Sequence, residues 1–254
     1  VLHNYVKSLS SVGIASYQSL YNPIVGNVDT SDMIAWWKFD NNSDDSSGNG
    51  NNLIAYGMSY TNSRNGIVAL FNGSSYFEIN NNGTFSPDNF TVSLWVNLQG
   101  SLNSKILYCR SITNQYGQTG QSNTGGNILT SYGWYIMRTN TDKLYFYTAG
   151  ATISTDRHRI IDDFFTNGSW VHIAVSIIRL TGDDATIKIY KDGILVLTYT
   201  NAYTRSVNTH LHIGTGTHST NDPLSQFLEN NSTIDDIRMY HTVLSDQEIL
   251  AIYN

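Results

Sequence analysis

Cysteine, glutamate and long apolar runs are scarce in this chain of 254 residues. The single cysteine, Cys109, excludes an intramolecular disulfide, and we expect it to be a small buried thiol in a strand. No apolar stretch is long enough to cross a bilayer and no signal-peptide pattern is present, so membrane insertion is not expected. The chain begins with Val1, which favours a mature or excised piece of a larger protein.

Charge is also scarce, at 13% of residues, and basic charge is the scarcer kind, with 14 Lys and Arg against 20 Asp and Glu. The net charge of −6, without a basic run or an RNA-binding motif, argues against nucleic acid as a partner. Only Glu78, Glu229 and Glu248 are glutamates, and they lie far apart. Glutamate pairs serve many glycosidases, whereas aspartates suit turns and calcium loops.

Aromatic residues are abundant, at 12%, and Gly, Asn, Ser and Thr are frequent. This composition is typical of short strands joined by many turns, and the length suits one large all-β domain. We place that domain at residues 33–254. Residues 1–32 lack clean periodicity, and we predict an N-terminal extension or an arm that docks on a neighbouring protein.

The C-terminal stretch predicts a strand over residues 233–240 that leads into a short helix. Alternation places Asp235 on the face of Ile237 and Met239; if that face is buried, the carboxylate must be paired, hydrogen-bonded or bound to a metal. Ser245 is the expected helix N-cap, and Glu248 completes a capping box.

Several segments in order resemble laminin-G-like jelly-roll domains of the concanavalin A-like lectin and glucanase superfamily. They are residues 37–40 (Trp-Lys-Phe-Asp), 45–48 (Asp-Ser-Ser-Gly), 69–73 (Ala-Leu-Phe-Asn-Gly), 90–96, 170–174 (Trp-Val-His-Ile-Ala), 189–193 (Ile-Tyr-Lys-Asp-Gly), 212–214 and 234–249. The resemblance implies an all-β, two-sheet antiparallel jelly-roll sandwich with a short C-terminal helix, closed by pairing of its first and last strands.

The resemblance also implies a non-catalytic carbohydrate- or glycoprotein-binding module of a surface, secreted or virion protein, stabilised by calcium. The loop at residues 40–52 is dense in Asp, Asn and Ser, which suits either an Asx-rich turn or a calcium loop. Because the first and last strands of this fold are neighbours, Asp45 and Asp235 are candidate ligands of one calcium ion.

Alternating strands define a candidate binding face. Residues 133–138 and 143–147 predict a hairpin, and residues 66–79 predict another that turns at Asn72-Gly73. The outward positions expected to share one sheet are Tyr108, Arg110, Tyr135, Tyr145, Tyr147 and His172. We predict that they form an aromatic, hydrogen-bonding face that binds a saccharide. The polar stretch at residues 111–130 is either a second binding loop or a solvated loop.

Two other functions stay open. The superfamily includes glycoside hydrolases, whose Glu-x-Asp-x-(x)-Glu motif is missing here, and polysaccharide lyases, for which Tyr145, Tyr147, His172 and Arg110 supply suitable groups. A structural jelly roll of a capsid or surface assembly, locked by the N-terminal arm, is the other alternative. His210, His212 and His218 lie near Asp222, but ordinary strand and loop histidines are favoured over zinc ligands.

Overall fold

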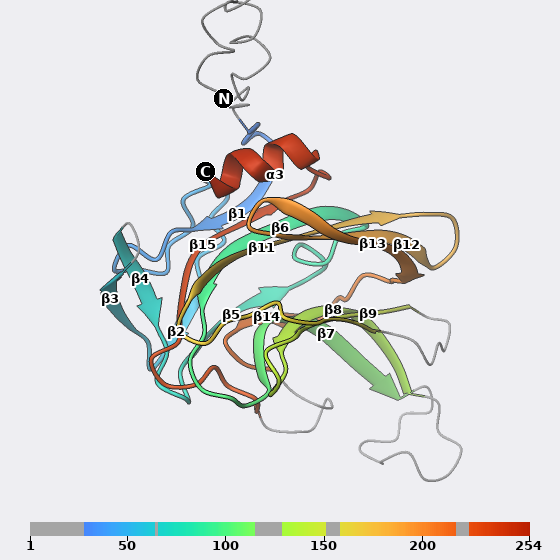
Figure 1. Cartoon of the computed structure of the whole chain (residues 1–254). Coiled ribbons are helices and arrows are strands. Elements are labelled where there is room, and N and C mark those ends of the chain that lie inside the picture. Colours follow the sequence, from blue (N-terminus) through green and yellow to red (C-terminus); the bar gives the residue numbers. More distant parts are fainter. Residues whose placement is uncertain (1–27, 64–65, 115–128, 151–157, 217–223) are drawn as a thin grey trace, which may run out of the picture.

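The computed structural model describes residues 28–63, 66–114, 129–150, 158–216 and 224–254. In that part of the chain the strands form two antiparallel sheets that face each other across an apolar core (Figure 1). This is the predicted two-sheet sandwich. Most of the predicted arm (residues 1–27), residues 115–128 of the polar stretch, and His218 with Asp222 lie outside the described residues. No helix in the described ranges is long and apolar enough to cross a bilayer.

The larger sheet forms the upper layer in Figure 1. In order across the sheet its strands are β13 (Ile194–Ala202), β12 (Asp184–Lys191), β11 (Trp170–Arg179), β6 (Asn89–Asn97), β15 (Thr233–Tyr240), β4 (Gly66–Leu70) and β3 (Ser59–Ser63). An eighth strand, β1 (Met33–Trp37), pairs with β15 in antiparallel orientation. The predicted pairing of the first and last strands is therefore confirmed.

The smaller sheet forms the lower layer. Its seven strands are, in order, β10 (His158–Ile161), β9 (Leu144–Ala149), β8 (Leu129–Arg138), β7 (Ser104–Asn114), β14 (Thr209–Ile213), β5 (Tyr76–Asn81) and β2 (Ile54–Tyr56). The predicted β8–β9 hairpin is confirmed.

The hairpin predicted at residues 66–79 is wrong, because β4 and β5 belong to different sheets. The Asn72 side chain accepts hydrogen bonds from the backbone amides of Ser74 (3.0 Å) and Ser75 (2.8 Å). This Asx turn carries the chain from one layer to the other instead of returning it along the same sheet.

The core follows the predicted alternation. On β11, Ile173 and Val175 are fully buried between the sheets, whereas His172 faces the other side. Cys109 is buried in the core as expected, and burial raises the pKa of its thiol. One face of every long strand therefore packs in the core between the sheets. Only the opposite, outer face is available for contacts with other elements or molecules.

The last strand departs from simple alternation. The pairing of β15 with β6 shifts between Asp235 and Arg238, and Asp236 has a positive φ of 52°. This bulge lets Ile237 enter the core while Asp235 lies opposite Trp95 on the outer face. Asp235 is buried, at 8% exposure, but the prediction that it shares the face of Ile237 is wrong.

The C-terminal helix α3 (Asp246–Tyr253) covers part of the outer face of the eight-stranded sheet (Figure 1). Ile249 and Ile252 pack against Tyr190 and Tyr240 of that sheet. The capping box is confirmed, because the Ser245 hydroxyl accepts from the Glu248 amide while the Glu248 carboxylate accepts from the Ser245 amide. The helix does not cover the outer face of the seven-stranded sheet.

Replacing Ser245 with Ala should lower the free energy of unfolding by about 1 kcal/mol, because the first turn of α3 loses its cap. Chemical denaturation of Ser245→Ala beside Gln247→Ala, an exposed position of the same turn, measures the difference. Equal stabilities for the two variants would show that the cap does not stabilise the helix.

Candidate functional site

Every strand of the seven-stranded sheet contributes an aromatic ring to its outer face. From the β2 edge to the β10 edge the rings are Tyr56, Tyr76, His212, Tyr108, Tyr135, the pair Tyr145 and Tyr147, and His158. Neighbouring rings are in contact, with centroid separations from 4.5 Å for Tyr56 and Tyr76 to 6.2 Å for Tyr76 and His212. We call this set the aromatic row. It crosses the whole sheet at right angles to its strands.

The cross-strand register explains the aromatic row. Tyr108 is directly opposite Tyr135, and Tyr135 is directly opposite Tyr147. The two pairs stack with centroids 5.7 Å and 4.7 Å apart. His212 and His158 continue the same register on the two sides. Directly opposed residues are the nearest neighbours on a sheet face, so flat rings at these positions stack.

Two basic side chains lie over the centre of the aromatic row. Lys105 Nζ is 4.8 Å from the ring centroid of Tyr108 and 5.2 Å from that of Tyr135. The guanidinium carbon of Arg110 is 4.6 Å from the ring centroid of Tyr147 and 6.0 Å from that of Tyr135. The faces of aromatic rings attract cations. Burial, and after it the charge of Arg110, lower the pKa of Lys105 to about 8.

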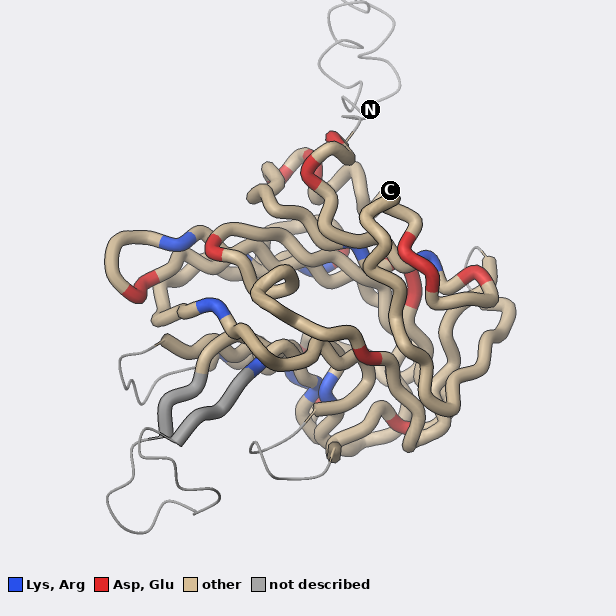
Figure 2. Tube along the Cα trace, turned by 180° about the vertical axis from the view of Figure 1, so that it is seen from behind, with Lys and Arg blue, Asp and Glu red and all other residues tan. Residues whose placement is uncertain are grey.

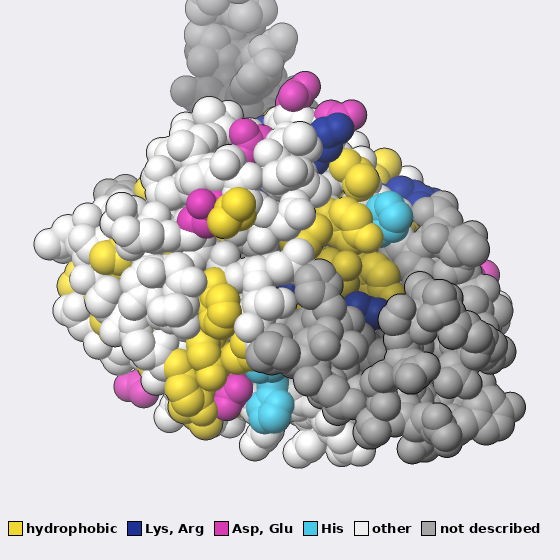
Figure 3. All heavy atoms as spheres, turned by 90° about the horizontal axis from the view of Figure 1, so that it is seen from below, with side chains coloured by type: hydrophobic (Ala, Val, Ile, Leu, Met, Phe, Trp, Pro, Cys, Tyr) yellow, Lys and Arg dark blue, Asp and Glu magenta, His cyan; other side chains and the backbone are white. Residues whose placement is uncertain are grey.

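Access to the aromatic row differs along its length. Tyr108 and Tyr135 are buried, whereas Arg110, Tyr145 and His158 are partly exposed. Figure 3 looks onto this face and shows hydrophobic side chains gathered beside histidine and basic side chains. Tyr145 and His158 stack with centroids 4.5 Å apart. The described surface that a ligand could reach therefore includes the β9 and β10 end of the row.

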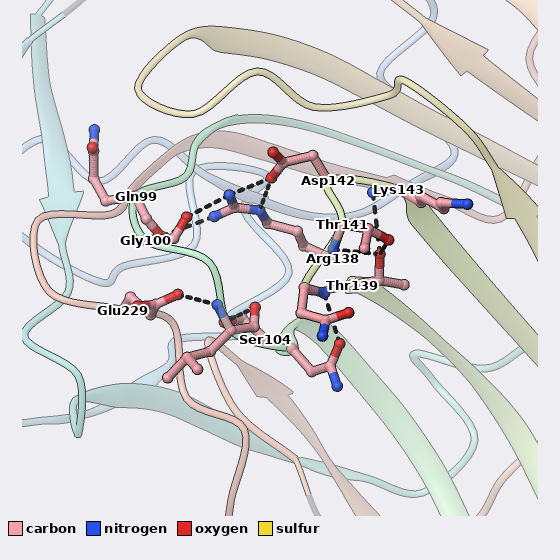
Figure 4. Close-up of polar contacts among 12 residues, drawn as sticks. Gln99, Gly100, Ser104, Arg138, Thr139, Thr141, Asp142, Lys143 and Glu229 are labelled. Atoms are coloured by element: carbon pink, nitrogen blue, oxygen red, sulfur yellow. Dashed lines mark hydrogen bonds and ion pairs between the residues drawn. The ribbon is translucent and has the colours of Figure 1, made fainter.

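A buried arginine holds the β8–β9 hairpin in place. Arg138 donates to the backbone carbonyls of Gln99 (2.9 Å) and Gly100 (2.6 Å) and to the carboxylate of Asp142 (Figure 4). Asp142 lies in the turn of the hairpin, and Gln99 and Gly100 lie in the connection from β6 to β7. The tyrosines of β8 and β9 therefore stand on a hairpin that is fixed at its turn by charge-assisted hydrogen bonds.

Five of the six predicted ligand-binding residues meet on this face, namely Tyr108, Arg110, Tyr135, Tyr145 and Tyr147. His172 does not, and the prediction that it shares one sheet with the tyrosines is wrong. It lies on β11 in the other sheet, fully buried, with Nε2 2.8 Å from the Ser93 hydroxyl and its ring against Trp95 and Tyr253. Simple alternation identified His172 as outward-facing but could not tell which sheet it belonged to.

The same placement separates the groups considered for a lyase, because His172 is on the opposite layer from Tyr145, Tyr147 and Arg110. The three glutamates also lie apart. Glu78 Oε2 is 3.4 Å from His212 Nε2, Glu229 accepts from the amide of Leu102, and Glu248 belongs to the capping box. No two of them face a common reacting position.

The Asp45 carboxylate is surrounded by hydrogen-bond donors of its own loop and of β1. It accepts from the backbone amides of Trp36 (2.9 Å), Ser47 (2.9 Å) and Asn51 (3.0 Å) and from the Ser47 hydroxyl (2.8 Å). Burial acts to raise the pKa of Asp45, but these bonds together lower it.

The described side chains contain no group of three or more His, Cys, Asp and Glu residues placed to hold a metal ion. Carbonyl and amide oxygens also bind calcium, so the site predicted at Asp45 and Asp235 stays a prediction. His210 and His212 share a face, with ring centroids 5.6 Å apart.

Lys105, His158 and His212 belong to the candidate site, although the sequence analysis did not include them. Lys105 is hidden from alternation by a bulge between Lys105 and Leu107, which turns the lysine outward with Tyr108. His158 lies on a strand of four residues, too short for a periodic signal. His212 could have been found, because it alternates with the buried Leu211.

The profile of a laminin G family, described as "Concanavalin A-like lectin/glucanases superfamily", matches residues 71–250. Among curated proteins no sequence matches this chain.

Solved structures share the fold. One is domain 4 of AbnA, a GH43 extracellular arabinanase from Geobacillus stearothermophilus, in complex with arabinotriose (20% identity, TM-score 0.56, covering 87% of this chain and 98% of that domain). Another is the binding domain of Paraclostridial Mosquitocidal Protein 1, with 16% identity and a TM-score of 0.59. The match covers 89% of this chain and 52% of that one. A third is the binding domain of Botulinum Neurotoxin DC in complex with SialylT, with 14% identity and a TM-score of 0.61. The match covers 89% of this chain and 51% of that one. The chain thus spans about half of each toxin binding domain.

His212 should make the fold sensitive to acid. Burial lowers the pKa of its imidazole to about 4, against the opposing effect of Glu78. The unfolded chain takes up this proton near pH 6.5 and the folded chain only near pH 4, so stability falls as the pH drops through that interval. The loss amounts to about 3 kcal/mol at most.

Chemical denaturation of the parent and of His212→Gln between pH 7 and pH 4 measures this effect, and the variant should show the shallower decline. His241→Gln, which removes an exposed imidazole, is the matched control and should follow the parent. Identical slopes for the parent and His212→Gln would contradict the assignment.

Proposed function

We propose, from the premise that this chain belongs to the concanavalin A-like lectin and glucanase superfamily, that it is a non-catalytic carbohydrate-binding module. The saccharide, free or on a glycoprotein, would bind the outer face of the seven-stranded sheet at the aromatic row. The observation that carries the proposal is the row itself, in which contacting rings cross every strand of one sheet.

The aromatic row has the chemistry that a saccharide requires. Sugar rings present apolar C–H surfaces, which pack on the faces of Tyr and other aromatic rings, and hydroxyls, which need donors and acceptors. Tyr145 supplies both, and Arg110 beside it adds guanidinium donors. Because the fixed β8–β9 hairpin presents these rings, little conformational freedom is lost on binding.

Two of the structural relatives support the proposal because they were solved with a ligand bound. The arabinanase domain was solved with arabinotriose, and a neurotoxin binding domain with SialylT. Their descriptions as an extracellular enzyme and as toxin binding domains favour a secreted or cell-surface setting for this chain as well. Calcium is a further proposed component, as a stabilising ion of the loop around Asp45.

Tyr145→Ala should weaken saccharide binding about tenfold, because a partly exposed ring that packs on the sugar is lost. Tyr145→Phe keeps the ring and removes only the hydroxyl, so it should retain most of the affinity. A glycan array on the parent identifies the sugar, and titration calorimetry on the three proteins compares their affinities, with circular dichroism to confirm folding. Binding by Tyr145→Ala equal to that of the parent would place the sugar elsewhere, and an array without any binding would reject the function.

A further inference from the structure

We propose that the saccharide is acidic and that Arg110, with Lys105 as a second cation, receives its negative charge at the aromatic row. The inference rests on the carbohydrate-binding function proposed above and adds the class of sugar. Neutral sugars need rings and hydrogen-bonding groups, which a tyrosine face supplies without cations. A second cation, Lys105, which shares the ring of Tyr135 with Arg110, is therefore more than the recognition of neutral sugar hydroxyls requires.

The seven-stranded sheet is opposite in charge to the chain as a whole. Its aromatic row carries the basic residues Lys105 and Arg110, and the one acidic residue of its strands is Glu78, whereas the chain carries −6. Figure 2 shows acidic positions mainly on turns and in the upper layer. Glu78 lies on β5, and β14 separates it from Lys105 and Arg110 on β7. A local positive potential within an acidic protein attracts anions to that face.

Arg110 has a hydrogen-bond donor without an acceptor among the described residues. Its Nε is buried there without a partner, and no carboxylate of those residues forms an ion pair with its guanidinium. A buried donor without an acceptor is unfavourable, and such groups point to a missing partner. A carboxylate or sulfate can form a charge-assisted hydrogen bond with the accessible N–H groups of the guanidinium. The Arg110 side chain as a whole is partly exposed, so a ligand can approach the guanidinium although Nε itself is covered.

Lys105 adds a charge that responds to pH. Its pKa of about 8 reflects burial and the nearby Arg110. Lys105 is itself buried, but a ligand anion bound at the nearby Arg110 favours the protonated amine through its field, so binding near pH 8 should be accompanied by proton uptake. Affinity for an acidic saccharide should decrease as the pH rises past 8, since the lysine then loses its charge. A neutral saccharide bound to the same tyrosines should show neither effect.

The negative group has two possible sources, a uronic or other sugar carboxylate and a sulfate ester. A matched set of probes separates them. It consists of an oligosaccharide that ends in a uronic acid, the same oligosaccharide with its carboxyl reduced to an alcohol, and a 6-O-sulfated form of the reduced oligosaccharide. Titration calorimetry on each, at pH 7 and pH 9 and in two buffers of different ionisation enthalpy, gives affinity and proton uptake together.

Arg110→Gln should weaken binding of the acidic oligosaccharide about 10- to 100-fold, because a charge-assisted pair is lost. Binding of the reduced oligosaccharide should change less than about twofold, as expected for uniform contacts with the rings. Lys188→Gln is the matched control, since it removes one positive charge from β12 of the other sheet. Lys105→Met should abolish the proton uptake while the Arg110 contact remains.

The outcomes separate the two proposals. If the reduced and acidic oligosaccharides bind equally well, the module binds saccharides but the preference for acidic ones is wrong. If none of the acidic, reduced and sulfated oligosaccharides binds, the carbohydrate-binding function is rejected, and this inference is rejected with it. Stronger binding of either charged form than of the reduced form, lost in Arg110→Gln but kept in Lys188→Gln, supports the inference and identifies the charged group.

Discussion

The structure depends on the burial of two sheets against each other. This requirement takes one face of each long strand into the core and pushes every second side chain outward. The two outer faces then differ in what covers them. The eight-stranded sheet packs α3 against Tyr190 and Tyr240, which makes it a second apolar interface. The seven-stranded sheet instead stacks its outward side chains on one another across the strands. The asymmetry between the two faces locates the candidate site.

The two cations at the centre of the aromatic row, Lys105 and Arg110, repel each other, and the faces of the rings attract both. Burial and mutual repulsion weaken the charge on Lys105, while the faces of Tyr108 and Tyr135 attract it. Such an arrangement is unfavourable for the fold in isolation. The acidic ligand proposed above would offset this cost. Arg138 differs from Arg110 in this respect, because its charge is matched within the protein by Asp142 and two carbonyls.

Much of the fold could be predicted because it rests on local patterns. The β8–β9 hairpin, the capping box and the pairing of β1 with β15 all follow from alternation, cap chemistry or family resemblance. Strand alternation identifies an outward side chain but carries no information on which sheet a strand joins. His172 was therefore grouped with tyrosines that lie on the other layer. Bulges set a second limit, since one extra residue reverses the alternation around Asp235 and around Lys105.

The aromatic row has a consequence for spectroscopy. Tyr135 is nearly parallel to both Tyr145 and Tyr147, with interplanar angles of 4° and 9° and centroids 5.8 Å and 4.7 Å away. Electronic transitions of rings this close and this ordered couple to one another, so their near-ultraviolet circular dichroism differs from that of isolated tyrosines. A sugar that settles on Tyr145 changes the surroundings of one chromophore within a coupled set. The molecule thereby contains an intrinsic optical reporter at the place where its ligand is expected to bind.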